Sequence, residues 1–164
     1  MNAARRSLDD PWVVARDELV RAVALAARWP ERHTAQAMSQ ENVGLVRAGF
    51  AAHNRGDLDA LTQLYDADVV FETLLLGTHH GKEAIRLLYE ENRKTLSGYT
   101  VDPIELIEVG DQVVAVAQVK GVGPVSQIAM EDRDQFAFLF TVKNGRVVRE
   151  QAFRNRQEAL EAAG

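Results

Sequence analysis

Residues 39–73 read SQENVGLVRAGFAAHNRGDLDALTQLYDADVVFET, and this stretch predicts two helices followed by a strand. In its first half, apolar residues recur at spacings of three and four as far as His53, which is the pattern of one buried helical face. The sequence NRGD at 54–57 interrupts this helix, because glycine ends it and Asp57 can cap a second one.

The second helix is short, with Leu58, Leu61 and Tyr65 on its inner face, and it leads to a strand at 69–73 and a loop at 77–81. The pattern then predicts a helix at 82–96, strands at 99–109, 112–120, 128–142 and 146–153, and a last helix at 155–163. Helices followed by a run of antiparallel strands predict an α+β fold, in which a curved sheet wraps round the helices.

The strand segment Val113–Ala117, VVAVA, is apolar on both faces. An antiparallel strand with one face in water should alternate between apolar and polar residues. We therefore expect both faces of the sheet to be covered, the inner one by helices and the outer one by a partner. This predicts a homodimer through the sheet, with Val114 or Val116 facing the second subunit.

Residues 1–37 are predicted to form a helical extension or arm, and residues 38–164 the α+β domain. Asp10-Pro11 is a typical helix start, and the alanine-rich segment 12–29 continues it. A disordered arm is the alternative. The charged residues within 16–21 interrupt any apolar core of a signal peptide, so we expect a cytoplasmic protein.

Composition narrows the function classes. The 164 residues include no cysteine, which excludes disulfides, thiolate metal sites and cysteine nucleophiles. The net charge is −5 and the 19 Lys and Arg residues are scattered, so a nucleic acid is not an expected partner. No apolar run approaches the ~18 residues of a membrane helix, so a membrane is not expected either.

The chain contains five further signals, which are Ser39–Val43, His53–Leu61, Gly81–Ile85, Asn144–Val147 and Glu158–Ala163. Together they resemble the SnoaL-like proteins of the nuclear transport factor two-like superfamily, over about residues 38–164. The resemblance implies a cystatin-like α+β cone. In such a cone a curved antiparallel sheet encloses three helices, and an apolar pocket lies at the open end.

The same resemblance implies that two known chemistries of this fold are missing. At the positions of the base and oxyanion groups of ketosteroid isomerase, the chain has Thr73, Gly49 and Phe138, or Ala137 in another alignment. At the positions where limonene-epoxide hydrolase holds its water, it has Val119, Ala117, Ala152, Phe71 and Thr73. Tyr65 and Tyr89 match two supporting tyrosines of the isomerase network.

The last hairpin can pair in two ways, which turn different residues inward. A two-residue turn at Asn144-Gly145 pairs Lys143 with Arg146, and a three-residue turn with a bulge pairs Val142 with Arg146. We favour the bulged turn. It places Phe136, Phe138 and Phe140 on the same face as Val148, Glu150 and Ala152, and Asp134 opposite Arg154.

Glu150 is then the best candidate acid or base, because a carboxyl group against phenylalanine side chains should have a raised pKa. The alternative places it at the pocket rim or in an ion pair with an arginine. His53 is the second candidate, with a satisfied core histidine as the alternative. His79-His80 lacks metal-ligand spacing and is predicted to be a solvated loop, so neither a metal nor another cofactor is expected.

The sequence thus predicts a SnoaL-like homodimer that binds a small, mostly apolar and cyclic molecule. The predicted ligand-binding residues are His53, Tyr65, Phe71, Thr73, Tyr89, Phe138 and Glu150. If the protein is an enzyme, we expect acid/base isomerisation, cyclisation or hydration, with Glu150 or His53 transferring the proton. The alternative is a non-catalytic ligand-binding or dimerisation module.

Overall fold

The computed structural model describes residues 36–122, 129–130 and 135–164. By internal contacts the chain divides into Met1–Met38 and Ser39–Gly164, and the elements described below belong to the second unit, except that residues 36–38 at the start of the first helix belong to the first. Nearly all of the helical extension predicted for residues 1–37 lies outside the described residues. So does Asp134, and with it the predicted pairing with Arg154.

The helices follow the predicted order. The first helix covers residues 36–55, and after it come α2 (Leu58–Gln63), α3 (Lys82–Thr95) and α4 (Arg156–Ala163). The NRGD turn ends the first helix at Gly56, whose φ of +74° favours glycine. Asp57 then caps α2 by accepting a hydrogen bond from the N–H of Ala60 at 3.0 Å. Tyr65 was predicted to lie on this helix, and that prediction is wrong. The helix α2 ends at Gln63, and Tyr65 is the first residue of a strand.

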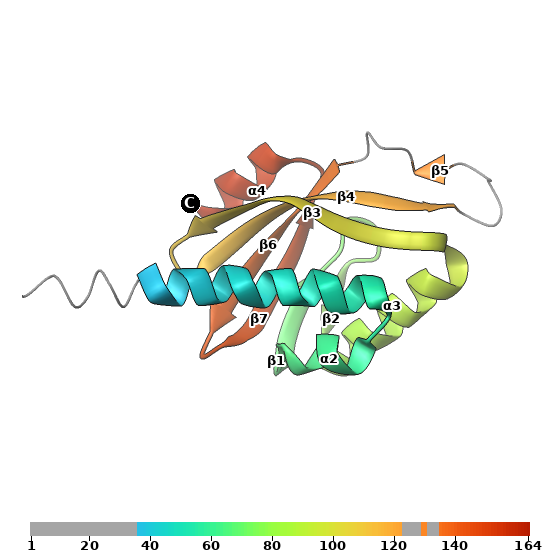
Figure 1. The fold of residues 1–164 in the computed structure, drawn as a ribbon, viewed down its shortest axis with the longest axis horizontal. Helices are drawn as coiled ribbons and strands as arrows, with labels where there is room; N and C mark the ends of the chain where they lie inside the picture. Colours follow the sequence, from blue (N-terminus) through green and yellow to red (C-terminus); the bar gives the residue numbers. More distant parts are fainter. Residues whose placement is uncertain (1–35, 123–128, 131–134) are drawn as a thin grey trace, which may run out of the picture. The chain divides into compact units, whose positions relative to one another are not determined.

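The strands are β1 (Tyr65–Glu72), β2 (Thr78–His80), β3 (Ser97–Val109), β4 (Gln112–Val122), β5 (Ala129–Met130), β6 (Gln135–Lys143) and β7 (Arg146–Phe153). They pair in the order β2-β1-β7-β6-β4-β3, with β5 on β4 (Figure 1). β2 stands where a loop was predicted, because residues 78–80 pair with β1. The predicted α+β class is confirmed.

One strand pair departs from the predicted antiparallel sheet. β1 and β7 run parallel, whereas the other described pairs are antiparallel, so the sheet is mixed. A parallel pair needs a long crossover between its strands, and here α3 and strands β3 to β6 supply it. The pairing matters for the site because it puts β7 in the interior of the sheet.

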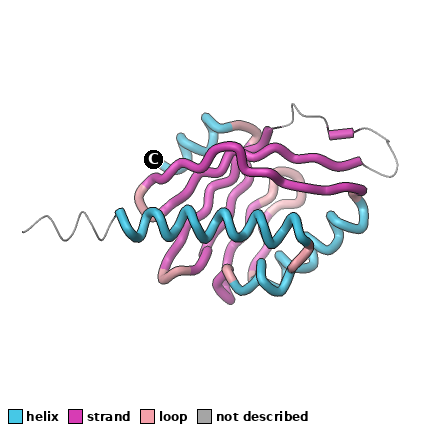
Figure 2. Tube along the Cα trace, in the orientation of Figure 1, coloured by secondary structure: helices cyan, strands magenta, loops and turns pink. Residues whose placement is uncertain are grey.

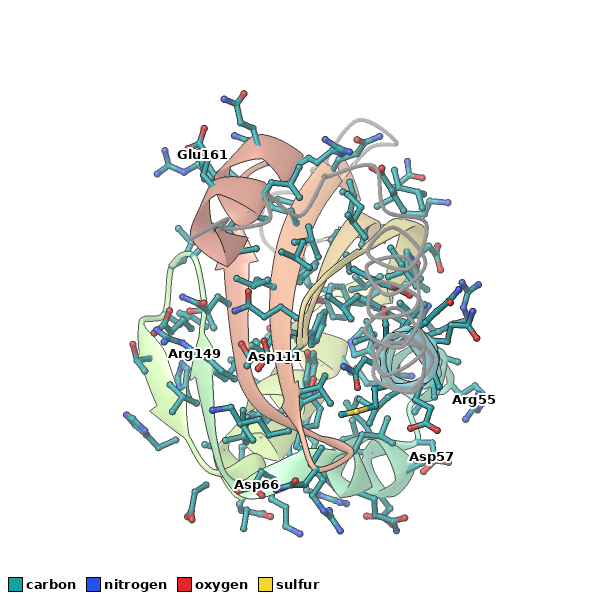
Figure 3. All side chains as sticks on the ribbon, turned by 90° about the vertical axis from the view of Figure 1, so that its left-hand side faces the viewer. Arg55, Asp57, Asp66, Asp111, Arg149 and Glu161 are labelled. Atoms are coloured by element: carbon teal, nitrogen blue, oxygen red, sulfur yellow. The ribbon has the colours of Figure 1, made fainter. Side chains whose placement is uncertain are left out.

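The two apolar faces of β4 belong to two separate cores. Val113 and Ala115 face the first helix, α2 and α3, whereas Val114 packs with Leu139 of β6 and Ala159 of α4. The tube view shows helices on both sides of the strands (Figure 2). In the side-chain view, Arg149 and Glu161 lie on one side of the strands and Arg55 and Asp57 on the other (Figure 3).

This arrangement explains the missing alternation in β4 within a single chain. At Val114 the outer face of the sheet is covered by α4 of the same chain. We had expected a second subunit to cover this face, and the homodimer was inferred from that expectation. The apolar strand therefore no longer requires a second subunit at that position. The homodimer itself stays a prediction.

The turn between β6 and β7 differs from the bulged three-residue turn that we favoured from the sequence. Lys143 pairs with Arg146, so the turn has two residues and the predicted three-residue turn is wrong. Asn144 and Gly145 have φ values of +52° and +69°, which is the geometry of the tight turns that suit the twist of a hairpin. An Asn-Gly pair adopts these angles at low cost, which explains the outcome.

A bulge in β7 nevertheless restores the predicted inward positions of Glu150 and Ala152. The register shifts between Thr141 and Val142, which leaves Val148 without a partner on β6. Beyond the bulge, Phe140 lies opposite Glu150 and both line the inner side. The prediction was wrong for Val148, because the bulge turns its neighbour Val147 inward.

Candidate functional site

A cavity of about 330 Å³ lies on the inner side of the sheet. Its walls come from the first helix, α2, α3, several strands and the loop between β1 and β2, and most of them are leucine, valine and phenylalanine side chains. The residues predicted to bind a ligand all line it, namely His53, Tyr65, Phe71, Thr73, Tyr89, Phe138 and Glu150. The fold therefore brings these residues together, and their binding role stays a prediction.

Glu150 occupies an interior position of the sheet. It lies opposite Phe140 of β6 and Phe71 of β1, so both neighbouring strands shield it from solvent. Its exposed fraction is 1%. This burial excludes the alternative in which Glu150 stands at the pocket rim.

Two tyrosine hydroxyls hold the Glu150 carboxyl. Tyr65, at the start of β1, donates to Oε2 at 2.5 Å, and Tyr89 of α3 donates to Oε1 at 3.4 Å. Within the described ranges, no arginine or lysine forms an ion pair with this carboxyl. The arginine pairing that we kept as an alternative is therefore absent from the described part of the chain.

Burial dominates the acid–base properties of this group. It raises the pKa of Glu150 to about 7, and the hydrogen bonds from Tyr65 and Tyr89 offset only part of the desolvation. Burial also raises the pKa of both tyrosines well above the usual value, so they remain hydrogen-bond donors at neutral pH. The carboxyl can thus gain or lose a proton near pH 7 while both tyrosines stay protonated.

His53 is a further buried polar residue of the cavity, with an exposed fraction of 3%. Its ring contacts the rings of Tyr89 and Tyr99 edge to face, at centroid distances of 4.8 and 5.2 Å. Its Nδ1 lies 3.1 Å from Oδ1 of Asn54. Burial lowers the pKa of His53, the hydrogen bond with Asn54 opposes this effect, and the Arg93 guanidinium adds to it.

Thr73 lines the cavity, but its hydroxyl serves the loop between β1 and β2. The hydroxyl accepts from the N–H of Leu76 at 2.8 Å and donates to the carbonyl of Gly77 at 3.1 Å. The loop presents residues 74–76, three leucines, of which Leu75 is 92% exposed. Because these leucines also line the cavity, its mouth is apolar.

The sequence reasoning missed three contributions to the site. Asn54 orients His53, Tyr99 packs on its ring, and the leucines at 74–76 form the mouth. The leucine run carried a usable signal, because three consecutive apolar residues before a glycine are unusual in a loop. The roles of Asn54 and Tyr99 depend on contacts between the first helix and β3, which leave no local pattern.

The fold and cavity define an α+β domain whose sheet encloses an apolar site that contains the buried acid Glu150. Residues 46–150 match the model of the SnoaL-like domain, which is more than half of the chain. The chain therefore belongs to the SnoaL-like domain family, as the sequence resemblance implied.

Solved structures show the same fold. A Sinorhizobium meliloti protein with a proposed polyketide cyclase role is 28% identical, with a TM-score of 0.57 over 66% of this chain and 93% of that one. Bal32a from a soil-derived mobile gene cassette is 23% identical, with a TM-score of 0.65 over 76% and 97%. An epoxide hydrolase from M. tuberculosis that resembles limonene-epoxide hydrolase is 15% identical, with a TM-score of 0.60 over 76% and 90%.

Among curated proteins, no sequence matches this chain. None of the helices in the described residues has the length and apolar character to span a membrane. No group of three or more His, Asp or Glu side chains in those same residues could hold a metal ion.

Proposed function

We propose that this protein binds a small, mostly apolar and cyclic molecule in the cavity and catalyses its isomerisation, cyclisation or hydration without a cofactor. Glu150 would be the catalytic acid and base. The observation that carries this proposal is the Glu150 carboxyl itself, buried among phenylalanines and held by two tyrosine hydroxyls. The size and the apolar lining of the cavity are typical of small-molecule pockets.

The chemistry follows from the environment of Glu150. A group with a pKa of about 7 can take a proton from a bound molecule and return it at another atom, because both of its forms are populated at neutral pH. When Glu150 is ionised, the hydroxyls of Tyr65 and Tyr89 stabilise its negative charge. His53 is the weaker of the two predicted proton carriers, since burial lowers its pKa.

One alternative function is a non-catalytic binding or dimerisation module. It is favoured by Thr73, whose hydroxyl is engaged within its own loop, and by Gly49 and Val119, which contribute no acid or base to the cavity. These are positions at which the resemblance implied catalytic groups in relatives.

Native mass spectrometry of the protein as purified is the first experiment. We expect a retained small apolar molecule, which would supply the substrate lead, and the same spectrum reports whether the protein is a dimer. Turnover of that compound would then be compared between the wild-type protein and Glu150→Gln. We expect a loss of at least about 100-fold, the usual contribution of a general acid or base.

Glu72→Gln is the matched control for this substitution. Glu72 lies on β1 outside the cavity lining and accepts hydrogen bonds from Arg149 and Gln151. Its replacement should leave turnover unchanged. Wild-type turnover in a folded Glu150→Gln protein would refute the catalytic role, and a retained ligand without any turnover by the wild-type protein would favour the binding module.

A further inference from the structure

The buried imidazole of His53 has one ring nitrogen that lacks a hydrogen-bond partner in the described residues. Its Nε2 is one of two buried side-chain nitrogen or oxygen atoms in the described residues that have no hydrogen-bond partner, and it belongs to a residue lining the cavity. Leaving such an atom unpaired costs free energy, so a native protein usually supplies a partner. The partner needed depends on whether Nε2 is a donor or an acceptor.

The hydrogen bonds of Asn54 fix its amide orientation. Its Nδ2 donates to the carbonyl of Val101 and to Oδ1 of Asp102, both at 3.0 Å, and its Oδ1 accepts from the N–H of Val101 at 2.9 Å. A flipped amide would place a donor against the Val101 N–H, which is unfavourable. The atom that faces His53 Nδ1 is therefore an acceptor.

Because this atom is an acceptor, it determines which imidazole nitrogen of His53 carries the hydrogen. Nδ1 must carry the hydrogen in order to donate to Asn54. Burial and the nearby Arg93 guanidinium both lower the pKa of His53, so the ring holds a single proton at neutral pH. Nε2 is then a bare lone pair, an acceptor without a donor.

The groups packed around the ring are engaged elsewhere. The Tyr89 hydroxyl donates to Glu150, and Arg93 donates to the backbone carbonyl of His53 at 3.0 Å. Tyr99 meets the imidazole with its ring, at an interplanar angle of 87°. Within the described part of the chain, no neighbouring side chain forms a hydrogen bond with Nε2.

We infer that His53 Nε2 accepts a hydrogen bond from the ligand, and that the ligand class is an apolar cyclic molecule carrying a hydroxyl group. This inference rests on the proposed function and deepens it. Tyr89 contacts both the His53 ring and the Glu150 carboxyl, so a hydroxyl on His53 would fix the orientation of the ring system beside the acid. An apolar ligand without a donor would leave Nε2 unpaired, as it is in the free protein, and would bind more weakly than a ligand that donates to it.

Two probes of nearly equal shape test this. 2-Naphthol carries a hydroxyl donor, whereas 2-methoxynaphthalene can only accept. We expect calorimetry to show about tenfold tighter binding of 2-naphthol to the wild-type protein. His53→Phe should abolish this preference and still bind 2-methoxynaphthalene.

His79→Phe is the matched control. His79 has the other unpaired buried Nε2, but it does not line the cavity, so its replacement should keep the tenfold preference. Imidazole 15N spectra of the wild-type protein remove any dependence on how the variants fold. We expect hydrogen on Nδ1 of His53 before ligand is added, and a shift of the Nε2 signal on addition of 2-naphthol.

The outcomes separate this inference from the proposed function. Hydrogen on Nε2, or equal affinity for the two probes with an unmoved Nε2 signal, would overturn the inference and leave the binding cavity intact. Failure of both probes to bind would instead reject the apolar binding cavity, and the inference with it.

Discussion

At the scale of the residue, Glu150 shows how burial outweighs hydrogen bonding. Two tyrosine hydroxyls favour its ionised form, yet its pKa still rises from 4.5 to about 7 because desolvation is the larger effect. A folded state with a raised carboxyl pKa holds its proton more tightly than the unfolded chain. Its contribution to stability is therefore complete below pH 4.5 and is lost as the pH rises through about 7.

Glu150→Gln should remove this pH dependence, because glutamine keeps the shape and does not ionise. The shift from 4.5 to about 7 corresponds to about 3 kcal/mol at 1.36 kcal/mol per pKa unit. Urea unfolding at pH 4.5 and at pH 8 should show the variant gaining about that much relative to wild type at the higher pH. A constant difference between the two proteins would contradict the raised pKa.

Phe50 is the second residue on which the site depends. It is 8% exposed and packs edge to face on Phe138 and Phe140, so it joins the first helix to β6. We expect Phe50→Ala to cost about 3–5 kcal/mol in the free energy of unfolding. The matched control is Leu75→Ala at the exposed loop, which should cost less than about 0.5 kcal/mol. A loss below ~1 kcal/mol at Phe50 would reject the assigned helix face.

At the scale of the element, α4 is the feature whose role the sequence left open. It packs on the outer face of β4 and β6, where Ala159 is fully buried against Val114 and Leu139. The helix is short, so packing and not intrinsic helix propensity must stabilise it.

Ala159→Asp should therefore release α4, because it places a charge in an apolar contact. We expect a loss of about 2–4 kcal/mol in chemical denaturation. Ala162→Asp, on the exposed side of the same helix, changes the same residue types and should cost less than about 0.5 kcal/mol. Equal effects at the two positions would mean that α4 does not pack on the sheet in solution.

At the scale of the whole molecule, a homodimer through the sheet is limited to the outer surface that α4 leaves open. There, Arg149 donates to Glu72 at 2.6 Å, and Gln151 donates to the same carboxylate at 2.6 Å. These strands carry polar groups on that side, so the interface would be more polar than the apolar one inferred from β4.

Light scattering tests this dimer. We expect the wild-type protein at twice the chain mass and Arg149→Glu at the mass of one chain, since the reversed charge would place two like charges together, at Glu72 and position 149, on the surface that the second subunit would cover. Lys143→Glu, at the exposed end of β6, is the control and should remain dimeric. A monomeric wild-type protein would contradict the homodimer outright.

The helical face from Val43 to His53, the NRGD turn and the inward phenylalanines of β6 could be predicted from the sequence. Each depends on neighbours a few positions apart, whose spacing records which face is buried. The hairpin turn was predicted less well. The sequence allowed two registers of the hairpin. In the structure the Asn-Gly turn is tight, and a bulge at Val148 shifts the register so that Glu150 still faces inward.

By itself, the sequence determined the α+β class, the family and seven of the residues that line the cavity. Only the tertiary structure decided that β1 and β7 run parallel, that α4 covers Val114, and that two tyrosines meet Glu150. Tyr65 and Tyr89 lie 85 and 61 positions from Glu150, and Asn54 lies 47 positions from the β3 backbone that orients it. Contacts of that separation arise when the sheet closes over the helices, and no local periodicity encodes them.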